Sequence, residues 1–406
     1  MNIGLLTPYY PDAQTTNSGL ANHFAVLAQA LDNLGHKVVI IHIRSAYEQD
    51  DVPVEQSLSK NINLLTYKVS LPAWLHKKLK NKWAVTDLLL KLKCMATAFK
   101  NINRIKKKYN LQVIETTSYF SLGYLYLFKK QQLPIVVRVS TTFLQMMDNY
   151  YPFKSRAQRE LGELEIKMIK KSRFLITHAH DHAREIEKLY SVNASNFTII
   201  PHGINLPVVA ASIQKKDTEP LKILYVGRFE YRKGTDTLLQ AIPLVLKTNP
   251  NVHFELIGSD PKNEYETGFK AQNSPQVFAN VTFSGNASNE ATNNAYAGCD
   301  IFVAPSRYES FGLIYIEAMS FGKPVIGCRV GGVPEIIEDN QNGLFAEMAD
   351  PVNLAEKILI LINNHQLRID MGINARKTVE DKFTKEKLAE NSVAYYKQAL
   401  TLFKQA

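Results

Sequence analysis

Short apolar runs recur along the whole chain, and most are followed by a longer segment with helical spacing. Runs of about four to six β-branched or aliphatic residues between helices are typical of parallel strands covered on both faces, as in doubly wound α/β domains. The runs are 3–6, 38–43, 113–115, 135–139, 174–177 and 198–200 in the first half, and 223–226, 253–257, 281–283, 301–304, 325–327 and 344–346 in the second. These two sets predict two such domains.

The boundary between the predicted domains lies near 201–205, which reads Pro-His-Gly-Ile-Asn. The stretch 207–220 mixes Ser, Gln, Lys, Asp and Pro without periodicity, which is typical of a linker. We therefore expect an N-terminal domain over 1–205 and a C-terminal domain over 206–384. The tail from about 385 to 406 has a helical pattern and could pack back on the N-terminal domain.

Composition places the chain among ordinary globular proteins, since 45% of its 406 residues are hydrophobic and 21% are charged. The formal charge of +10 favours anionic partners such as sugar nucleotides, acidic membrane surfaces or nucleic acid. Three widely spaced cysteines, Cys94, Cys299 and Cys328, predict buried thiols in a cytoplasmic protein rather than disulfides. We find no secretory signal pattern and no apolar run of roughly 18 residues that would predict a membrane span.

A glycine turn that carries several cations follows the apolar run 223–226. It reads Gly-Arg-Phe-Glu-Tyr-Arg-Lys-Gly over 227–234, and a helical pattern begins directly after it. Backbone amides and the positive end of such a helix attract an anion, and arginine can bind it with two parallel hydrogen bonds. The turn therefore predicts a diphosphate site with Arg228 and Lys233 as its cations; the alternative is a solvated basic loop.

Two carboxylates follow the apolar run 301–304. Glu309 lies in the loop after this run, and Glu317 lies two turns along the next helical segment. Ligands of open α/β sheets bind at the carboxyl ends of the strands, where carboxylates can hold sugar and ribose hydroxyls. The apolar run 311–316 implies that one side of the site is apolar and excludes water, so a carboxylate there must be hydrogen-bonded. The alternative is a purely structural pair.

Together these motifs have a specific order. The spacing Glu309-x7-Glu317, preceded by Pro-Ser and containing Phe-Gly-Leu, resembles the signature of retaining glycosyltransferase family 4. Further matching segments are Gly-Arg at 227–228, Lys-Gly at 233–234, Leu-Ile-Gly at 256–258, Phe-Ser-Gly at 283–285 and Gly-Gly-Val-Pro-Glu at 331–335. The segment 201–205 looks like the family's interdomain hinge. The resemblance implies the GT-B architecture, two Rossmann-like doubly wound domains that face each other across a cleft.

The resemblance also implies roles for the matching residues. Arg228 and Lys233 would neutralise the diphosphate of a nucleotide sugar, and Glu309 would contact hydroxyls of the donor sugar as a positioning group rather than a covalent nucleophile. The other donor-binding positions would be Gly227, Gly258, Phe311, Gly312, Leu313 and Glu317, of which Glu317 would bind the ribose. Cations and amides stabilise a leaving diphosphate without a metal, and the chain contains no Asp-x-Asp. We expect no metal and no cofactor besides the substrate.

The first half matches the family less tightly. Gly19 lies where the family has its opening glycine loop, and would let backbone amides approach the donor phosphates or the acceptor. Many relatives have a histidine after the strand near 135–139 that reaches the donor sugar, whereas this chain has Ser140 there. We take Arg138 and Ser140 as candidates on the acceptor or sugar side, and a reduced or altered activity stays open.

The basic segment 76–108 contains a single acid, Asp87, and its apolar residues recur at helical spacing, with Trp74 and Trp83 near its start. A basic amphipathic helix with aromatic residues can lie on an anionic leaflet and would suit a lipid-linked acceptor. The alternative is that its apolar stripe packs in the N-terminal core. The triplet His178, His180 and His182 suggests a metal site. We expect these histidines to be polar loop residues instead, because such alternating side chains need not converge on one metal ion.

The resemblance implies transfer of a hexosyl unit to a glycan or glycolipid precursor of a cell-surface polysaccharide or glycolipid, in the cytoplasm or on the inner face of the membrane. We expect a UDP-sugar donor first and GDP-mannose second. The alternatives are a GT-B-like sugar-nucleotide epimerase or phosphorylase and a non-catalytic nucleotide-sugar regulator. A dinucleotide oxidoreductase is disfavoured because no G-x-G-x-x-G follows the first apolar run, and a nucleic-acid-binding module is not recognisable.

Overall fold

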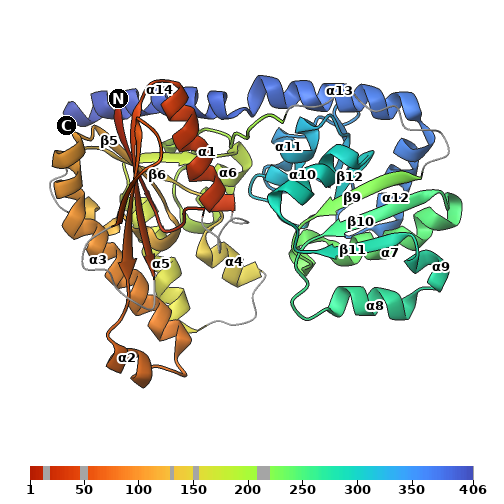
Figure 1. Ribbon diagram of the computed structural model, residues 1–406, viewed down its shortest axis with the longest axis horizontal. Coiled ribbons are helices and arrows are strands. Elements are labelled where there is room, and N and C mark those ends of the chain that lie inside the picture. Colours follow the sequence, from red (N-terminus) through yellow and green to blue (C-terminus); the bar gives the residue numbers. More distant parts are fainter. Residues whose placement is uncertain (12–18, 46–53, 129–131, 150–154, 208–219, 406) are drawn as a thin grey trace. The chain divides into compact units, whose positions relative to one another are not determined.

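The computed structural model describes residues 1–11, 19–45, 54–128, 132–149, 155–207 and 220–405. The chain divides into two compact units, which we call unit 1 (Met1–Gly203 with Lys385–Ala406) and unit 2 (Ile204–Thr384). Each unit is a largely parallel sheet with helices on both faces (Figure 1). The predicted linker falls mostly on 208–219, outside the described residues.

The sheet of unit 1 has eight strands in the order β3-β4-β2-β1-β5-β6-β7-β8, and every neighbouring pair is parallel except β3 and β4. The strands are β1 (Asn2–Thr7), β2 (Lys37–Ser45), β3 (Val54–Ser57), β4 (Ile62–Val69), β5 (Val113–Thr117), β6 (Ile135–Arg138), β7 (Phe174–Thr177) and β8 (Phe197–Ile199). The sequence reading missed β3 and β4. All four residues of β3 are exposed, and β4 alternates between buried and partly exposed side chains, so neither forms a continuous apolar run.

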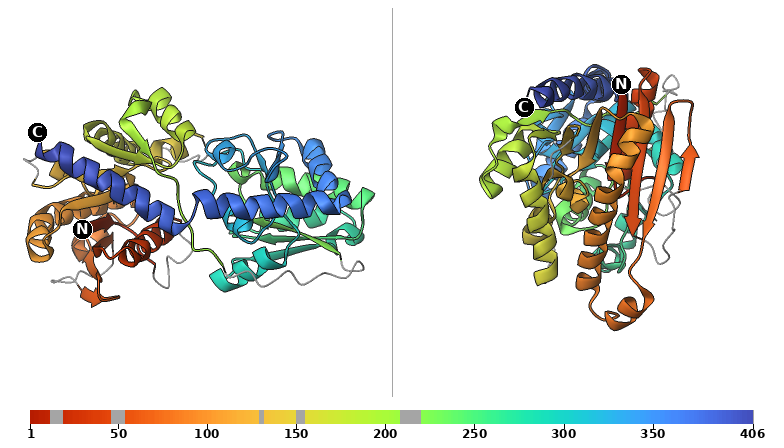
Figure 2. Two further views of the ribbon diagram at one scale, coloured as in Figure 1. Left: turned by 90° about the horizontal axis from the view of Figure 1, so that it is seen from above. Right: turned by 90° about the vertical axis from the view of Figure 1, so that its left-hand side faces the viewer.

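The two faces of this sheet form separate cores. Along β2, Val38 and Ile40 pack with α1 (Gly19–Asn33) and α14 (Lys385–Lys404). Val39 and Ile41 pack on the opposite face with α3 (Trp83–Tyr109), α5 (Arg156–Lys171) and α6 (His180–Tyr190), because successive side chains of a strand point to opposite sides. The remaining helices of unit 1 are α2 (Ala73–Lys78), η1 (Tyr119–Ser121), η2 (Tyr124–Phe128), α4 (Phe143–Asn149) and η3 (Ala194–Asn196). Figure 2 shows α14 running along one side of unit 1.

Unit 2 contains a six-stranded parallel sheet in the order β11-β10-β9-β12-β13-β14. Its strands are β9 (Leu221–Val226), β10 (Val252–Ile257), β11 (Val281–Gly285), β12 (Ile301–Ala304), β13 (Val325–Cys328) and β14 (Gly343–Ala346), so all the predicted runs of the second half are confirmed. The helices are η4 (Tyr231–Lys233), α7 (Thr235–Thr248), α8 (Glu264–Gln272), α9 (Pro275–Phe278), α10 (Asn289–Gly298), α11 (Leu313–Ser320), η5 (Val333–Glu335), α12 (Pro351–Asn363) and α13 (His365–Lys382). Helices α7, α8 and α12 cover one face, and α10, α11 and α13 cover the other.

The predicted fold class, two Rossmann-like doubly wound α/β domains, is confirmed by these two sheets. In each sheet the strand order reverses beside the first strand, between β1 and β5 in unit 1 and between β9 and β12 in unit 2. Ligands of open α/β sheets bind outside the carboxyl ends of the strands at this switch point. Among the described residues, no helix is long and apolar enough to cross a bilayer.

Candidate functional site

The glycine turn after β9 packs directly against the segment after β12. Gly234 has φ +67° and stands immediately before α7, and a Cβ added to it would lie 1.8 Å from the carbonyl oxygen of Pro305. Gly258, after β10, is equally close to the turn, since its Cβ would lie 1.8 Å from the carbonyl oxygen of Gly227. Only glycine fits at such approaches. The glycines therefore bring the loops at the switch point of unit 2 into backbone contact.

This contact joins two residues that the sequence analysis singled out. The Lys233 Nζ lies 2.5 Å from Oε1 of Glu309, and the Ser306 hydroxyl donates a hydrogen bond of 3.0 Å to the same oxygen. The side chains of the pair are only 14% and 9% exposed. Burial lowers the pKa of Lys233, and the adjacent Glu309 opposes this shift. A charge so poorly hydrated interacts more strongly with an incoming anion than a surface lysine does.

The other two cations of the turn, Arg228 and Arg232, both form ion pairs with Glu230. Arg232 is mostly buried and lies 2.7 Å from Oε1 of Glu230. The predicted cation Arg228 lies 3.3 Å from the same oxygen, and its side chain is 54% exposed. Arg228 therefore lies in the predicted turn, where it is exposed and paired with Glu230.

Arg307, to which the sequence analysis assigned no role, ties the two loops together. Its guanidinium donates to both carboxylate oxygens of Asp236 at 2.6 and 2.8 Å, and to the carbonyl oxygen of Tyr231 at 2.7 Å. It also stacks 3.8 Å from the centre of the Tyr231 ring. Arg307 and Ser306 are thus positioning residues for the Lys233–Glu309 pair. Their partners could not be read from local spacing, because Asp236 lies 71 residues earlier.

The loop after β12 ends at the first turn of α11. Gly312 has φ +108° and stands immediately before Leu313, the first residue of the helix. The first amides of a helix have no intrahelical acceptor and carry its positive end, so they can bind an anion. Phe311 packs in the core beside this turn, and the amide of Gly332 donates to the carbonyl oxygen of Glu309 at 3.0 Å. The backbone amides predicted to bind the donor, those of Phe311, Gly312 and Leu313, therefore come shortly after Glu309 in the chain.

Glu317, the second predicted carboxylate, lies on α11 and is partly exposed. It accepts a hydrogen bond of 3.0 Å from the Tyr296 hydroxyl, a partner that sequence analysis did not find. Burial raises the pKa of Glu317, and the Tyr296 bond opposes the shift. A half-buried carboxylate of this kind can accept hydrogen bonds from sugar hydroxyls.

Unit 1 holds the remaining predicted site residues. Gly19 is the exposed first residue of α1, and residues 12–18 before it lie outside the described residues. Ser140 is half-buried just beyond β6. Arg138, by contrast, is 2% exposed and donates to Glu115 at 2.7 Å and to Ser392 of α14 at 3.4 Å. Arg138 is therefore a core residue that joins the sheet to α14, and we do not carry it into the proposed site.

The histidines form a buried group that the sequence analysis did not foresee. The rings of His178 and His182 stack 4.7 Å apart, and His178 also stacks on His202 at 5.0 Å. His202 contacts His23 of α1 at 3.0 Å between Nδ1 atoms, whereas His180 is exposed. Burial lowers the pKa of His182 to about 4 and also lowers that of His202. Two of the three predicted loop histidines are thus core residues, and the described chain shows no group of side chains placed to hold a metal.

Two family models match this chain. The model described as Glycosyltransferase Family 4 matches residues 17–207, and the model described as Glycosyl transferases group 1 matches residues 210–378. The chain belongs to glycosyltransferase family 4. An uncharacterised glycosyltransferase of Methanocaldococcus jannaschii is 38% identical over 164 residues, which are 40% of this chain and 44% of the relative. This family 4 chain spans about half the length of the curated relatives it matches.

Solved structures of other proteins show the same fold. Sucrose-phosphate synthase from Thermosynechococcus elongatus matches with a TM-score of 0.75 at 20% identity, over 100% of both chains. An Anabaena protein solved in complex with UDP and glucose matches with a TM-score of 0.67 at 18% identity, over 97% of this chain and 98% of that one. At these identities the likeness establishes the GT-B type of fold for this family 4 member.

Proposed function

We propose that this chain is a retaining, metal-independent hexosyltransferase whose unit 2 holds a nucleoside-diphosphate sugar. The observation that carries the proposal is the buried Lys233–Glu309 pair at the switch point of unit 2. Family membership supports it, as does the structural neighbour that was solved with UDP and glucose. That neighbour makes a UDP-sugar the first candidate donor, and GDP-mannose remains the second. The acceptor would be a glycan or glycolipid precursor.

The chemistry follows from the charges around the pair. When the anomeric carbon–oxygen bond breaks, negative charge grows on the leaving diphosphate, and preplaced positive groups stabilise it. Lys233, Arg228 and the first-turn amides of α11 would supply that stabilisation. Glu309, held by Lys233 and Ser306 together, would accept hydrogen bonds from the sugar. The acceptor oxygen would bond to the anomeric carbon on the same face, and its proton would pass to the leaving phosphate.

The proposal is tested by thermal unfolding with UDP-glucose, UDP-galactose, UDP-N-acetylglucosamine, GDP-mannose and ADP-glucose, followed by nucleotide release in the presence of EDTA. A ligand that binds the folded state raises the Tm, so one nucleotide base is expected to give a clear shift. We expect the protein to release that nucleotide with EDTA present. We also expect NMR to show that the product keeps the anomeric configuration of the donor. Binding without transfer or hydrolysis would instead support a regulator, and an epimerised donor would support an epimerase. No shift with any donor would contradict the site.

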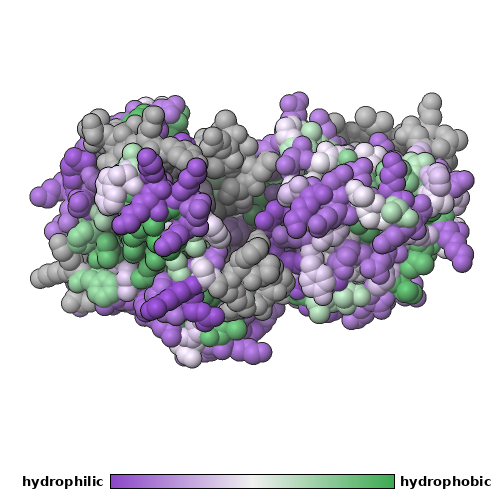
Figure 3. Space-filling model, turned by 90° about the horizontal axis from the view of Figure 1, so that it is seen from below, coloured by the Kyte–Doolittle hydropathy of each residue, from purple (hydrophilic) through white to green (hydrophobic). Residues whose placement is uncertain are grey.

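We also propose that one end of unit 1 contacts an anionic membrane surface, which would deliver a lipid-linked acceptor. Part of the apolar stripe predicted within 76–108 is buried. On α3, Met95 and Ile102 pack in the core, as the alternative interpretation required. Its N-terminal end and α2 instead expose Trp74 (66%) and Trp83 (62%). The lysines Lys77, Lys78, Lys80 and Lys82, which lie between the two tryptophans in the sequence, are also exposed. Tryptophan beside lysine is the composition of a membrane-interface contact. Figure 3 looks onto this side of the molecule, where hydrophilic and apolar residues lie next to each other.

Cosedimentation with phosphatidylglycerol-containing vesicles at low salt tests the membrane proposal. We expect the wild type to pellet with anionic but not with neutral vesicles, because each lysine near an anionic surface contributes about 1 kcal/mol. The double change Lys77→Glu and Lys78→Glu is expected to abolish pelleting. The matched control, Lys397→Glu with Lys404→Glu on α14, makes the same change in net charge at exposed positions elsewhere on unit 1 and is expected to keep it. Equal loss in both variants, or no pelleting of the wild type, would contradict a specific contact.

A further inference from the structure

Four histidines of unit 1, which come from four separate segments of the chain, lie ring against ring in one row. In order along the row they are His182 on α6, His178 after β7, His202 after β8 and His23 on α1. The centres of neighbouring rings lie 4.7, 5.0 and 4.8 Å apart in that order. We call this group the histidine row. The proposed donor site in unit 2 does not include it.

Most of the histidine row is removed from water. The exposed fraction is 0% for His182, 1% for His178 and 5% for His23. His202 keeps partial exposure, so solvent protons can reach the row at this ring. Nδ1 of His182 lies 2.7 Å from the Thr177 hydroxyl, and Nε2 of the same ring has no hydrogen-bond partner among the described residues. Such buried imidazoles favour the neutral form, because burial disfavours the charged one.

Charged groups lie around the row on the elements that pack against it. They include Glu115 of β5, Arg138 of β6, the Asp181–Arg184 ion pair of α6 and, beside Glu115, the Tyr396 hydroxyl of α14. Glu115 lies 3.8 Å from Nε2 of His23. It already accepts hydrogen bonds from Arg138 at 2.7 Å and from Tyr396 at 2.6 Å. A proton added to the row therefore places a second positive charge beside the Arg138 guanidinium, whose carboxylate partner is already engaged.

The pKa values of the row follow from these surroundings. Burial lowers the pKa of His182 to about 4. Burial also lowers the pKa of His202, and the neighbouring histidines and Arg138 lower it further. For His23, burial and Arg138 lower the pKa, while Glu115 opposes the shift. A histidine in an unfolded segment titrates near 6.5, so the row stabilises the fold fully above about pH 6.5, and this contribution is lost as the pH falls towards about 4.

The row also anchors a segment by which the chain leaves unit 1. His202 lies two residues before Ile204, the first residue of unit 2, and its ring packs between two other imidazoles of the row. The Ile200 amide donates to the carbonyl oxygen of Thr177 at 2.8 Å, and the Ile200 carbonyl oxygen accepts from Arg138 at 3.1 Å. Segment 200–203 is therefore held to the sheet of unit 1 by residues that also surround the row.

We propose that the histidine row is a pH-sensitive latch: neutral rings hold α6 and segment 200–203 against the sheet of unit 1, and protonation in mildly acidic conditions releases them. Burial and the mutual repulsion of charged rings both oppose protonation in the closed form, so proton uptake and opening are coupled. The latch concerns the folding of unit 1 and does not depend on the proposed donor or acceptor.

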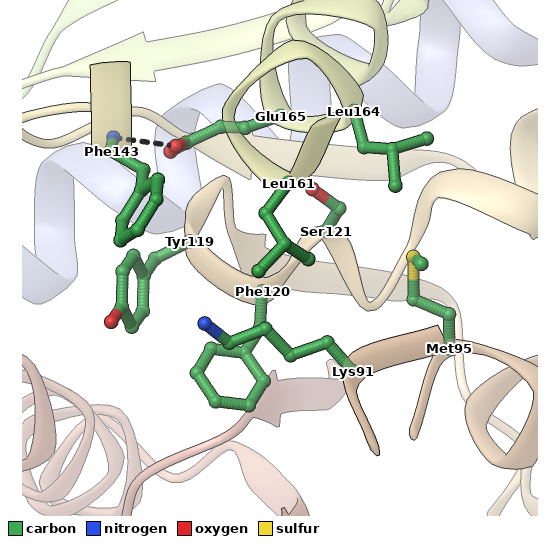
Figure 4. Close-up of a pocket in the computed structure, with 9 residues that line it drawn as sticks. All are labelled: Lys91, Met95, Tyr119, Phe120, Ser121, Phe143, Leu161, Leu164 and Glu165. Atoms are coloured by element: carbon green, nitrogen blue, oxygen red, sulfur yellow. Dashed lines mark hydrogen bonds between the residues drawn. The ribbon is translucent and has the colours of Figure 1, made fainter. Parts of the chain in front are cut away.

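A second buried titratable group of unit 1 responds to acid in the opposite direction. Glu165 of α5 lines the small hollow between α3, η1, α4 and α5 that Figure 4 shows, and it accepts hydrogen bonds from the Ser118 hydroxyl at 2.6 Å and the Phe143 amide at 2.8 Å. The Lys91 ammonium lies in the same hollow, 4.6 Å from the centre of the Phe120 ring. Burial raises the pKa of Glu165 to about 7, so acidification neutralises this buried carboxylate and favours the folded state.

Hydrogen exchange of the full chain at pH 7 and pH 5, read by mass spectrometry and corrected for the intrinsic exchange rate, tests the latch. A ring that titrates near 6.5 when open and at about 4 when closed raises the opening constant about twentyfold between these pH values. We expect peptides covering α6 and 197–203 to lose at least about tenfold in protection at pH 5. Peptides covering α5, around Glu165, and α11 of unit 2 are expected to keep their protection.

The double variant His182→Asn with His202→Asn removes two titrating rings. Both rings make their contacts through Nδ1, with Thr177 and with His23, and an asparagine amide places a neutral polar atom near that position. We expect this variant to lose most of the response to acid. His180→Asn is the matched control, because His180 is an exposed histidine on α6, and it should respond as the wild type does. If the double variant does not fold, His182→Asn alone is used and should lose the share of the response that belongs to that ring.

Unchanged protection of the wild type between pH 7 and pH 5 would overturn the proposal. Equal loss of protection throughout unit 1, α5 included, would overturn it as well, because it would indicate general acid destabilisation. A wild-type response in the asparagine variants would exclude the row as its cause. No nucleotide sugar takes part in the measurement, so its result is separate from that of the donor-binding test.

Discussion

Turnover of the Lys233→Ala variant is expected to fall by about 10²–10³-fold, the usual effect of removing one preplaced group that stabilises a developing charge. The Lys233 ammonium is buried against Glu309 at 2.5 Å, so a neighbouring surface cation cannot easily take its place. Affinity for UDP should fall as well, because the diphosphate loses its least hydrated cation. Steady-state kinetics and calorimetric titration with UDP measure the two effects.

Lys247→Ala provides the matched control, since Lys247 is an exposed lysine on α7 of the same unit. Loss of Lys233 also leaves Glu309 buried without its partner, and removing one member of a buried ion pair destabilises a protein by about 3–5 kcal/mol. The double variant Lys233→Met with Glu309→Gln removes both charges and should recover most of the lost stability without recovering turnover. Wild-type turnover in Lys233→Ala would contradict the role of this residue.

Gly234→Ala is expected to disrupt unit 2 severely. The new Cβ would lie 1.8 Å from the carbonyl oxygen of Pro305, at a φ of +67° that alanine disfavours, so the backbone must move. We expect the free energy of unfolding to fall by about 3 kcal/mol or more, because the costs of backbone strain and of overpacking add. Urea unfolding monitored by circular dichroism measures it, together with loss of UDP binding.

Gly268→Ala is the control for this prediction. Gly268 lies within α8, has no atom within 4 Å of its added Cβ, and has ordinary helical backbone angles. Replacing a helical glycine by alanine stabilises a helix by about 0.5–1 kcal/mol, so this variant should be as stable as the wild type or slightly more stable. A Gly234→Ala protein with wild-type stability would show that the turn does not pack on Pro305 as described.

The parts of the site that could be predicted are those with a local signature. A continuous apolar run predicts a buried parallel strand, and this reasoning placed both Lys233 and Glu309 after the carboxyl end of such a strand, where the structure has them. The same reasoning missed β4, because a strand with one half-exposed face alternates instead of forming a run. It also proposed Arg138 for the site, because the sequence alone does not tell whether an arginine at the end of a strand faces a ligand or a buried partner such as Glu115.

The sequence by itself therefore determined the doubly wound class, the division into two domains and the family, because strand burial and glycine turns are properties of short segments. Only the tertiary structure decided which side chains meet: Lys233 with Glu309, Arg307 with Asp236, and Lys91 with its aromatic rings. The physical reason is that hydrogen bonds and ion pairs act over a few ångströms between loops that are far apart in the chain. Burial, which governs the charge and hydration of these groups, likewise arises only when the elements have packed.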